Sequence, residues 1–232
     1  MKYVLVHGGP GAAGSLHGFA KELRFVTGAE VVEAVQTKRA VPELIEETAS
    51  QITDSPIVIG HSWGAWLAAL TLAKYPDIAE KFIAVGCPPL TDEYVPLIRE
   101  RRLENLSETE REEYFKAEAL GDIETIARLA AKSDNFSAAP GRDGDFDKAL
   151  FDAVWPSAAE MRTKGEILKA FTELTCPTHF IFGDRDPHPS EGVTEPLDKE
   201  LIDYEIDIIT DCGHSPFREL FAAAEFFDII TN

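Results

Sequence analysis

The segment Ile57-Val-Ile-Gly-His-Ser-Trp-Gly64 joins a short apolar run to the start of a helical pattern. Its first three residues are β-branched, as in a buried strand, and residues 63–75 are rich in Ala, Leu and Trp, as in a buried helix. Glycines stand two positions before and after Ser62, so a tight strand-to-helix turn can present its hydroxyl above a sheet. We therefore predict that Ser62 is a nucleophile.

A second glycine-rich stretch, His7-Gly-Gly-Pro-Gly11, directly follows the first apolar run of the chain. A nucleophilic serine needs two backbone N–H groups aimed at the oxyanion that forms on its substrate. Trp63 supplies one of them, because it follows the serine at a helix N-terminus. Pro10 has no N–H, so a neighbour must supply the other, and we expect that neighbour to be Gly9.

A serine nucleophile also needs a general base, and we assign this role to His214. It stands in the turn Asp211-Cys-Gly-His-Ser-Pro216, between the last predicted strand and the last predicted helix, where a side chain can reach over the carboxyl edge of the sheet. The other five histidines are expected elsewhere: His179 within a strand, His17 on the first helix, His188 in a proline-flanked loop, and His7 and His61 in the two glycine-rich turns.

The carboxylate that orients the base is expected in Gly183-Asp-Arg-Asp-Pro187, which follows a predicted strand. We favour Asp186, because it lies further out in the loop and can turn toward His214. Asp184 remains an alternative, although it can instead cap the turn or pair with the neighbouring arginine. Asp211 is less suitable, since it lies only three residues from the base. All of these residues stand in turns, so alanine replacements of the catalytic set are expected to leave the fold largely intact.

Metal and cofactor binding are not expected. Asp184, Asp186 and His188 form an acidic and imidazole cluster, but it lacks a ligand set of recognised spacing. The chemistry predicted from the serine, the histidine and the aspartate needs no cofactor.

Outward from residues 57–64, short apolar runs alternate with helical patterns. This alternation predicts a mainly parallel sheet of about six strands in the α/β class. The expected strands are Tyr3–Val6, Glu30–Val35, Ile57–Ile59, Phe82–Val85, His179–Phe182 and Tyr204–Ile209. The expected helices between and after them are Leu16–Val26, Pro42–Gln51, Trp63–Tyr75 and Pro216–Ile230.

The alternation breaks once, over about residues 90–171, where only helix-start signals are found. Capping boxes are predicted at Ser107 and at Ser157, a helix end followed by a helix start at Gly121-Asp122, and a helix break at Trp155-Pro156. Residues 133–145 contain proline and glycines and are expected to be flexible. Because the sheet resumes afterwards, we interpret the insertion as a helical cap within a single domain of residues 1–232.

The composition limits the partners. The 41 Asp and Glu residues outnumber the 22 Lys and Arg residues and give a net charge of −19, so neither nucleic acid nor an anionic membrane is an expected partner. The three cysteines, Cys87, Cys176 and Cys212, show no paired spacing, and no apolar run is long enough for a signal or a membrane span. We expect a cytoplasmic protein.

The order Ser62, Asp186, His214 in this strand and helix frame resembles the α/β-hydrolase superfamily, and the likeness extends over the whole chain except the insertion. The resemblance implies an eight-stranded sheet, from which two N-terminal strands are missing here, because the first strand leads directly into residues 7–11. Those five residues, together with Ser-Trp-Gly after the strand, are similar to the proline iminopeptidase group. That group commonly has glycine where His61 stands. The carboxylates by which it binds the free amine of a peptide lie in its cap, which cannot be aligned with the insertion of this chain.

Several functions fit these residues. The leading hypothesis is a serine hydrolase that cleaves an ester or amide through an acyl-enzyme, like a carboxylesterase, acting on a small ester, amide or short peptide. An aminopeptidase of the proline iminopeptidase type is the alternative. A lyase or transferase on the same triad, and a ligand-binding receptor or pseudoenzyme, remain open. The sequence does not determine the oligomeric state.

Overall fold

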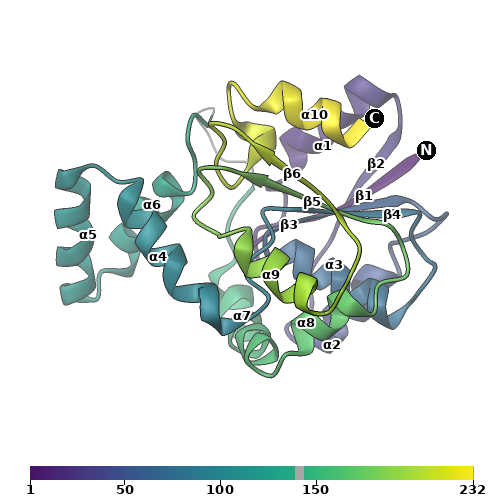
Figure 1. Cartoon of the computed structure of the whole chain (residues 1–232), viewed down its shortest axis with the longest axis horizontal. Helices are drawn as coiled ribbons and strands as arrows, with labels where there is room; N and C mark the ends of the chain where they lie inside the picture. The colour runs from purple at the N-terminus through teal and green to yellow at the C-terminus, as the bar shows by residue number, and fades with distance from the viewer. Residues whose placement is uncertain (139–143, 232) are drawn as a thin grey trace.

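The computed structural model describes residues 1–138 and 144–231. Six parallel strands form one open sheet in the order β2-β1-β3-β4-β5-β6 (Figure 1). The strands are β1 Lys2–Val6, β2 Glu30–Ala34, β3 Ile57–His61, β4 Lys81–Val85, β5 Thr178–Gly183 and β6 Glu205–Ile209. All six predicted strands are confirmed to within two residues at each end. The continuous apolar runs were informative because strands of a parallel sheet are covered on both faces.

Helices cover the two faces of this sheet and form two separate cores (Figure 1). The helices outside the insertion are α1 His17–Thr27, α2 Val41–Ala49, α3 Trp63–Lys74, α9 Glu191–Lys199 and α10 Ala223–Thr231. Helices α1 and α10 pack on one face, and α2, α3 and α9 lie on the other. Helix α3 is apolar on all sides and is buried through its first ten residues, so β3 and α3 form a rigid support for the turn between them.

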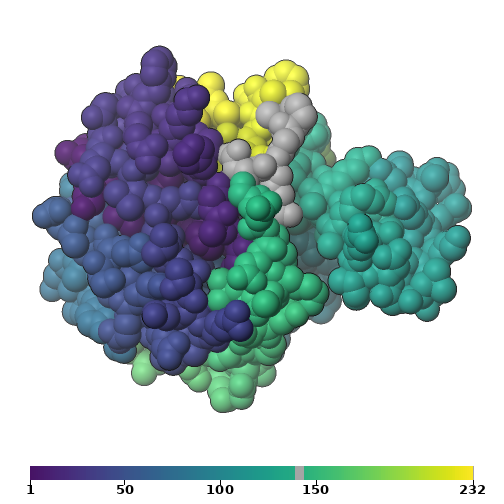
Figure 2. All heavy atoms as spheres, turned by 180° about the vertical axis from the view of Figure 1, so that it is seen from behind, coloured from purple at the N-terminus to yellow at the C-terminus, as the bar shows by residue number. Residues whose placement is uncertain are grey.

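The predicted insertion lies between β4 and β5 and contains no strand among its described residues. Its elements are the short 3-10 helix η1 Asp92–Tyr94 and the helices α4 Val95–Glu104, α5 Glu108–Leu120, α6 Ile123–Ser133, α7 Lys148–Thr163 and α8 Glu166–Thr172. Helices α7 and α8 pack on the body, whereas α5 and α6 stand away from it as a hairpin (Figures 1 and 2). A small core of its own holds this hairpin together, formed by Leu106, Tyr114 and Leu129 with Leu103 and Ile126.

Two of the four helix signals predicted in the insertion are correct and two are wrong. Ser107 forms the predicted capping box, and Gly121 ends α5 in a left-handed conformation just before Asp122 caps α6. The predicted break at Trp155-Pro156 and the helix start at Ser157 are wrong, since α7 continues through both. Pro156 lies on the exposed side of α7, where water can bond the carbonyl group that lacks its helical N–H partner.

Two further helix expectations need correction. Helix α9 was not predicted, because Pro196 inside it and the prolines before it mask its helical pattern. The predicted helix Pro216–Ile230 is two pieces, the short 3-10 helix η2 Pro216–Arg218 and α10. Glu219 interrupts them in an extended conformation, with φ −73° and ψ 130°.

Part of the segment expected to be flexible, residues 139–143 with Pro140 and Gly141, lies outside the described residues. On its N-terminal side, α6 extends to Ser133, and Ala138 forms an isolated antiparallel bridge with Glu219. Within the described ranges, no helix is both long and apolar enough to cross a membrane.

Candidate active site

Ser62 occupies a strained turn between β3 and α3. Its backbone has φ 55° and ψ −126°, which is unusual for a residue other than glycine. The flanking glycines are needed for close packing: a Cβ atom on Gly60 would lie 2.5 Å from the carbonyl oxygen of Gly64, and one on Gly64 would lie 2.0 Å from the carbonyl oxygen of Val6. The strand-to-helix turn predicted around Ser62 is therefore present, and it presents the serine at the carboxyl edge of the sheet.

The structure brings His214 and Asp186 together. The Nδ1 atom of His214 lies 2.8 Å from Oδ2 of Asp186, and because a carboxylate only accepts, the imidazole donates. The side chain of Asp186 is fully buried and that of His214 is 9% exposed. The Nε2 atom of a neutral His214 is then unprotonated. His214 and Ser62 line one cavity of about 270 Å³.

A second imidazole, which the sequence analysis placed in a loop without a role, shares the same carboxylate. His188 donates to Oδ1 of Asp186 from its backbone N–H at 2.8 Å and from Nδ1 at 2.9 Å. Its ring stacks on His214 with 4.1 Å between the ring centroids. The spacing Asp-Pro-His was a usable signal, because an aspartate side chain readily bonds the backbone two residues later.

The charges of this group follow from its contacts. Burial alone would raise the pKa of Asp186, but the two imidazoles outweigh it and hold that pKa well below its ordinary value. Burial opposes the charged form of His214, yet Asp186 raises the pKa of His214 overall. Burial and the neighbouring His214 together lower the pKa of His188. His214 is therefore the imidazole of this group that gains a proton most easily.

His61 packs beside His214 from the turn that carries Ser62. Its Nε2 donates to the carbonyl oxygen of His214 at 3.0 Å, and the two ring centroids lie 4.9 Å apart. Burial and repulsion by His214 lower the pKa of His61 to about 3. His61 thus stays neutral and holds the backbone of the His214 turn.

The two residues predicted to supply the oxyanion donors, Gly9 and Trp63, line one cavity together with Ser62. Trp63 is the first residue of α3, so its N–H has no partner within the helix. Gly9, with φ 32°, lines the cavity with Ser62, and a Cβ atom there would meet only Phe146 at 3.8 Å. Both residues thus border a cavity at Ser62, and their role as oxyanion donors stays a prediction.

The competing carboxylates take other places. Asp184 is exposed and accepts from the backbone N–H of Cys212 at 3.3 Å, so it supports a turn. Asp211 is also exposed and lies 3.8 Å from Arg185. The metal-ligating atoms that come together, within 4.8 Å of one another, belong to Asp186, His188 and His214, a set without Asp184. Both oxygens of Asp186 already accept hydrogen bonds in this arrangement.

Glu219 is a buried carboxylate that the sequence analysis did not identify. Its Oε1 accepts from the backbone N–H groups of Gly213 at 3.0 Å and Phe136 at 2.9 Å, and its Oε2 accepts from the backbone and hydroxyl of Ser137. It therefore ties the turn that holds His214 to the segment after α6. The sequence gives little indication of this role, because a glutamate after Pro216-Phe-Arg218 is also typical of an ordinary helix start.

We expect Glu219→Gln to lower the free energy of unfolding by about 2–4 kcal/mol. Both carboxylate oxygens of Glu219 accept hydrogen bonds, and in glutamine one of them becomes an NH2 group, which would face a backbone N–H donor without being able to accept from it. Urea denaturation measures this loss. Glu225→Gln, at an exposed position of α10, is the control and should stay within about 0.5 kcal/mol of the wild type. Equal stability of the two variants would contradict the role given to Glu219.

Comparisons with known proteins identify the family and the fold of this chain. A family model described as the alpha/beta hydrolase family matches residues 3–229. The chain belongs to the alpha/beta hydrolase family. The predicted fold class and the expectation of a hydrolase enzyme are confirmed at the level of that family. A search of curated proteins gave no match.

Solved structures show the same fold at low sequence identity. VinJ has a TM-score of 0.72 and 16% identity over 99% of this chain and 88% of that one. A proline iminopeptidase from Mycobacterium smegmatis has a TM-score of 0.68 and 16% identity over 99% and 87% of the two chains. A structure from a study of carboxylesterases of the thaumarchaeon Nitrososphaera gargenis has a TM-score of 0.61 and 16% identity over 99% and 88%.

Proposed function

We propose that this protein is a serine hydrolase that cleaves a small ester or amide through an acyl-enzyme on Ser62. The observation that carries the proposal is the buried hydrogen bond between His214 and Asp186 beside a strained serine turn that faces the same cavity. The function of the solved carboxylesterases is consistent with it.

The reaction proceeds in two halves. The Oγ atom of Ser62 attacks the carbonyl carbon while Nε2 of His214 takes its proton, and the N–H groups of Gly9 and Trp63 stabilise the oxyanion. His214 then gives that proton to the leaving group as the bond to the acyl carbon breaks. Water next attacks the acyl-enzyme, His214 takes a proton from it, and Ser62 regains that proton as the acid is released. Asp186 orients the imidazole in both halves.

The test is covalent labelling by a fluorophosphonate, followed by turnover of two chromogenic substrates. We expect one label per chain on Ser62 and steady turnover of 4-nitrophenyl butyrate. Strong turnover of prolyl 4-nitroanilide would instead support the aminopeptidase alternative, which residues 7–11 favour. Labelling without turnover of either substrate would favour a receptor, and absence of label would contradict the proposal.

The pH dependence provides a second test. His214 must be neutral to act as a base, and its pKa is raised above the ordinary value of 6.5. We therefore expect kcat/KM for 4-nitrophenyl butyrate to rise with pH along a single limb of slope one, with its midpoint above pH 6.5. His188 and His61 have lowered pKa values, so neither adds a second limb above pH 6.5. A midpoint well below 6.5, measured between pH 5 and 9, would contradict this assignment.

A further inference from the structure

Two cavities meet at Ser62. The first, of about 270 Å³, is the one lined by His214 and His61, and we call it the His214 cavity. The second, of about 530 Å³, is called here the arginine cavity. Its lining includes Ser62, Arg99, Arg102, Phe151, Trp155 and Arg162. An acyl substrate bound at Ser62 has both cavities available, one for each side of the scissile bond.

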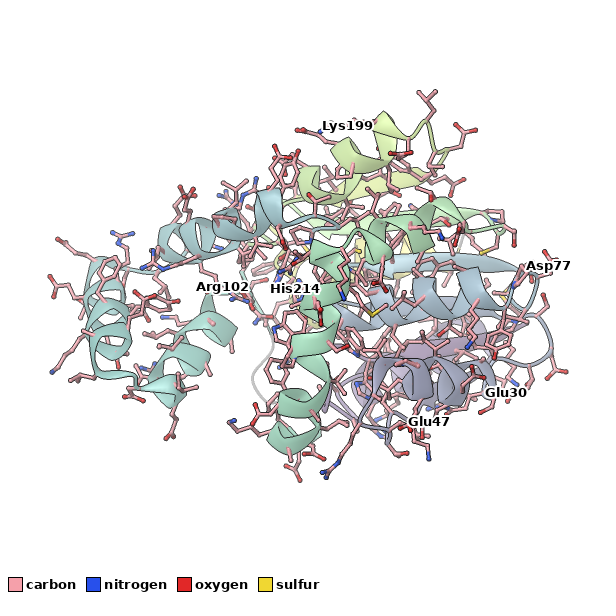
Figure 3. All side chains as sticks on the ribbon, turned by 90° about the horizontal axis from the view of Figure 1, so that it is seen from below. Glu30, Glu47, Asp77, Arg102, Lys199 and His214 are labelled. Atoms are coloured by element: carbon pink, nitrogen blue, oxygen red, sulfur yellow. The ribbon has the colours of Figure 1, made fainter. Side chains whose placement is uncertain are left out.

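Helices α4 and α7 form the walls of the arginine cavity. Helix α4 contributes Val95, Ile98, Arg99 and Arg102, whose spacing of three, four and seven residues places them on one helix face. Arg102 lies in the last turn of α4 and lines both cavities, and Figure 3 shows it in the region of His214. The wall formed by α7 is aromatic near Ser62 and ends at an arginine.

The charge of this lining is one-sided. Three of its residues are arginines, and no carboxylate lines it among the described residues. A carboxylate outside this lining holds each guanidinium: Arg99 bonds Glu118 at 2.7 and 3.0 Å, Arg102 bonds Asp134 at 2.7 and 2.8 Å, and Arg162 bonds Asp92 at 2.6 Å. Of these carboxylates, Asp134 lines the His214 cavity.

These pairs leave donors for a ligand. The carboxylates of Glu118 and Asp134 engage Nε and Nη2 of their arginines, and the Nη1 groups have no hydrogen-bond partner within residues 1–138 and 144–231. The side chain of Arg162 is only 12% exposed and stacks over Trp66, with 5.6 Å between its guanidinium carbon and the ring centroid. Such fixed guanidinium groups suit a carboxylate or a phosphate.

The position of the base decides which part of the substrate enters the arginine cavity. The leaving group receives its proton from His214, and His214 lines the smaller cavity but not the larger one. The leaving group therefore departs through the His214 cavity. We propose that the arginine cavity binds the acyl part of the substrate and that this acyl group carries an anion, a carboxylate or a phosphate, at its far end. This inference rests on the proposed function and adds the substrate class.

The test compares esters that share a leaving group and an acyl length. Mono-4-nitrophenyl adipate carries a carboxylate, methyl 4-nitrophenyl adipate is its neutral match, and 4-nitrophenyl 5-phosphonopentanoate carries a phosphonate after the same four methylene groups. We expect kcat/KM for an anionic ester to exceed that for the neutral ester by about tenfold or more. The faster of the two anionic esters identifies the carboxylate or the phosphate as the natural group.

Substitutions then locate the effect. Arg99→Gln and Arg162→Gln should each lower the ratio of anionic to neutral kcat/KM by about tenfold. Arg101→Gln is the matched control, because Arg101 lies on the same helix and pairs with Glu191 but lines a different cavity. Its ratio should equal that of the wild type.

The outcomes separate the two proposals. If the neutral ester is turned over as fast as the anionic esters, the inference is wrong while the serine hydrolase proposal stands. An anionic preference that survives both arginine substitutions also overturns the inference. If the fluorophosphonate labels Ser62 but no ester turns over, protection by adipate decides: slower labelling supports the anion site, and an unchanged rate overturns it. If Ser62 is not labelled, both proposals fail.

Discussion

Replacing Ser62 with alanine is expected to lower kcat for 4-nitrophenyl butyrate by about five to six orders of magnitude, because it removes the only atom that forms the acyl-enzyme. Backbone geometry at this turn should persist, since alanine makes no larger demand on a φ of 55° than serine does. Steady-state hydrolysis and the melting temperature, measured on the same preparation, test both statements. The residual rate should come from the oxyanion donors alone.

A matched serine provides the control for this experiment. Ser50 ends α2, is exposed, and its hydroxyl donates to the carbonyl of Glu47, far from both cavities. Ser50→Ala should therefore keep wild-type turnover and labelling. Retention of more than about 1% of activity by Ser62→Ala at an unchanged melting temperature would overturn the acyl-enzyme mechanism.

Much of the site was predictable because short segments determine it. The Gly-x-Ser-x-Gly pattern specifies its own turn, since Gly60 and Gly64 are the residues that the close packing of α3 on β1 and β3 requires. The carboxyl ends of parallel strands lie at one edge of the sheet, so turns after β1, β3, β5 and β6 come together. Strand patterns alone thus indicate which loops share a site.

The parts of the site and the fold that were not predicted depend on contacts between residues that are distant in sequence. Glu219 accepts hydrogen bonds from the backbone of Gly213 and of Phe136, and nothing near Glu219 in the sequence indicates these contacts. The arginines of the cavity come from two helices of the insertion whose facing sides are set by tertiary packing. Pro156 is tolerated within α7 because its side of the helix faces water. Helix propensities do not indicate which side of a helix will be exposed.

The hydrogen bonds of Asp186 also determine which substitution best tests the role of its carboxylate. The sequence analysis expected alanine to be harmless to the fold, but the side chain is fully buried. Alanine would leave the imidazole donors of His214 and His188 unpaired, with a cost to stability. Asparagine keeps the shape and changes only the bonding, so it isolates the role of the carboxylate.

We expect Asp186→Asn to lower kcat by about four orders of magnitude. The Oδ1 position accepts from two donors, the backbone and Nδ1 of His188, whereas Oδ2 accepts from His214 alone in the part of the chain that the structure describes. The amide oxygen will therefore take the Oδ1 position, and the amide NH2 will face His214. His214 must then carry its proton on Nε2, where it cannot accept the proton of Ser62. Hydrolysis of 4-nitrophenyl butyrate at pH 8 measures the loss.

Removing His188 tests this explanation. In Asp186→Asn/His188→Ala, one donor remains at the Oδ1 position instead of two, so the amide can turn its oxygen toward His214 more often. The double variant should be about tenfold more active than Asp186→Asn, although His188→Ala alone should be slightly less active than the wild type. If the double variant loses activity in proportion to both single changes, the shared carboxylate does not select the tautomer of His214.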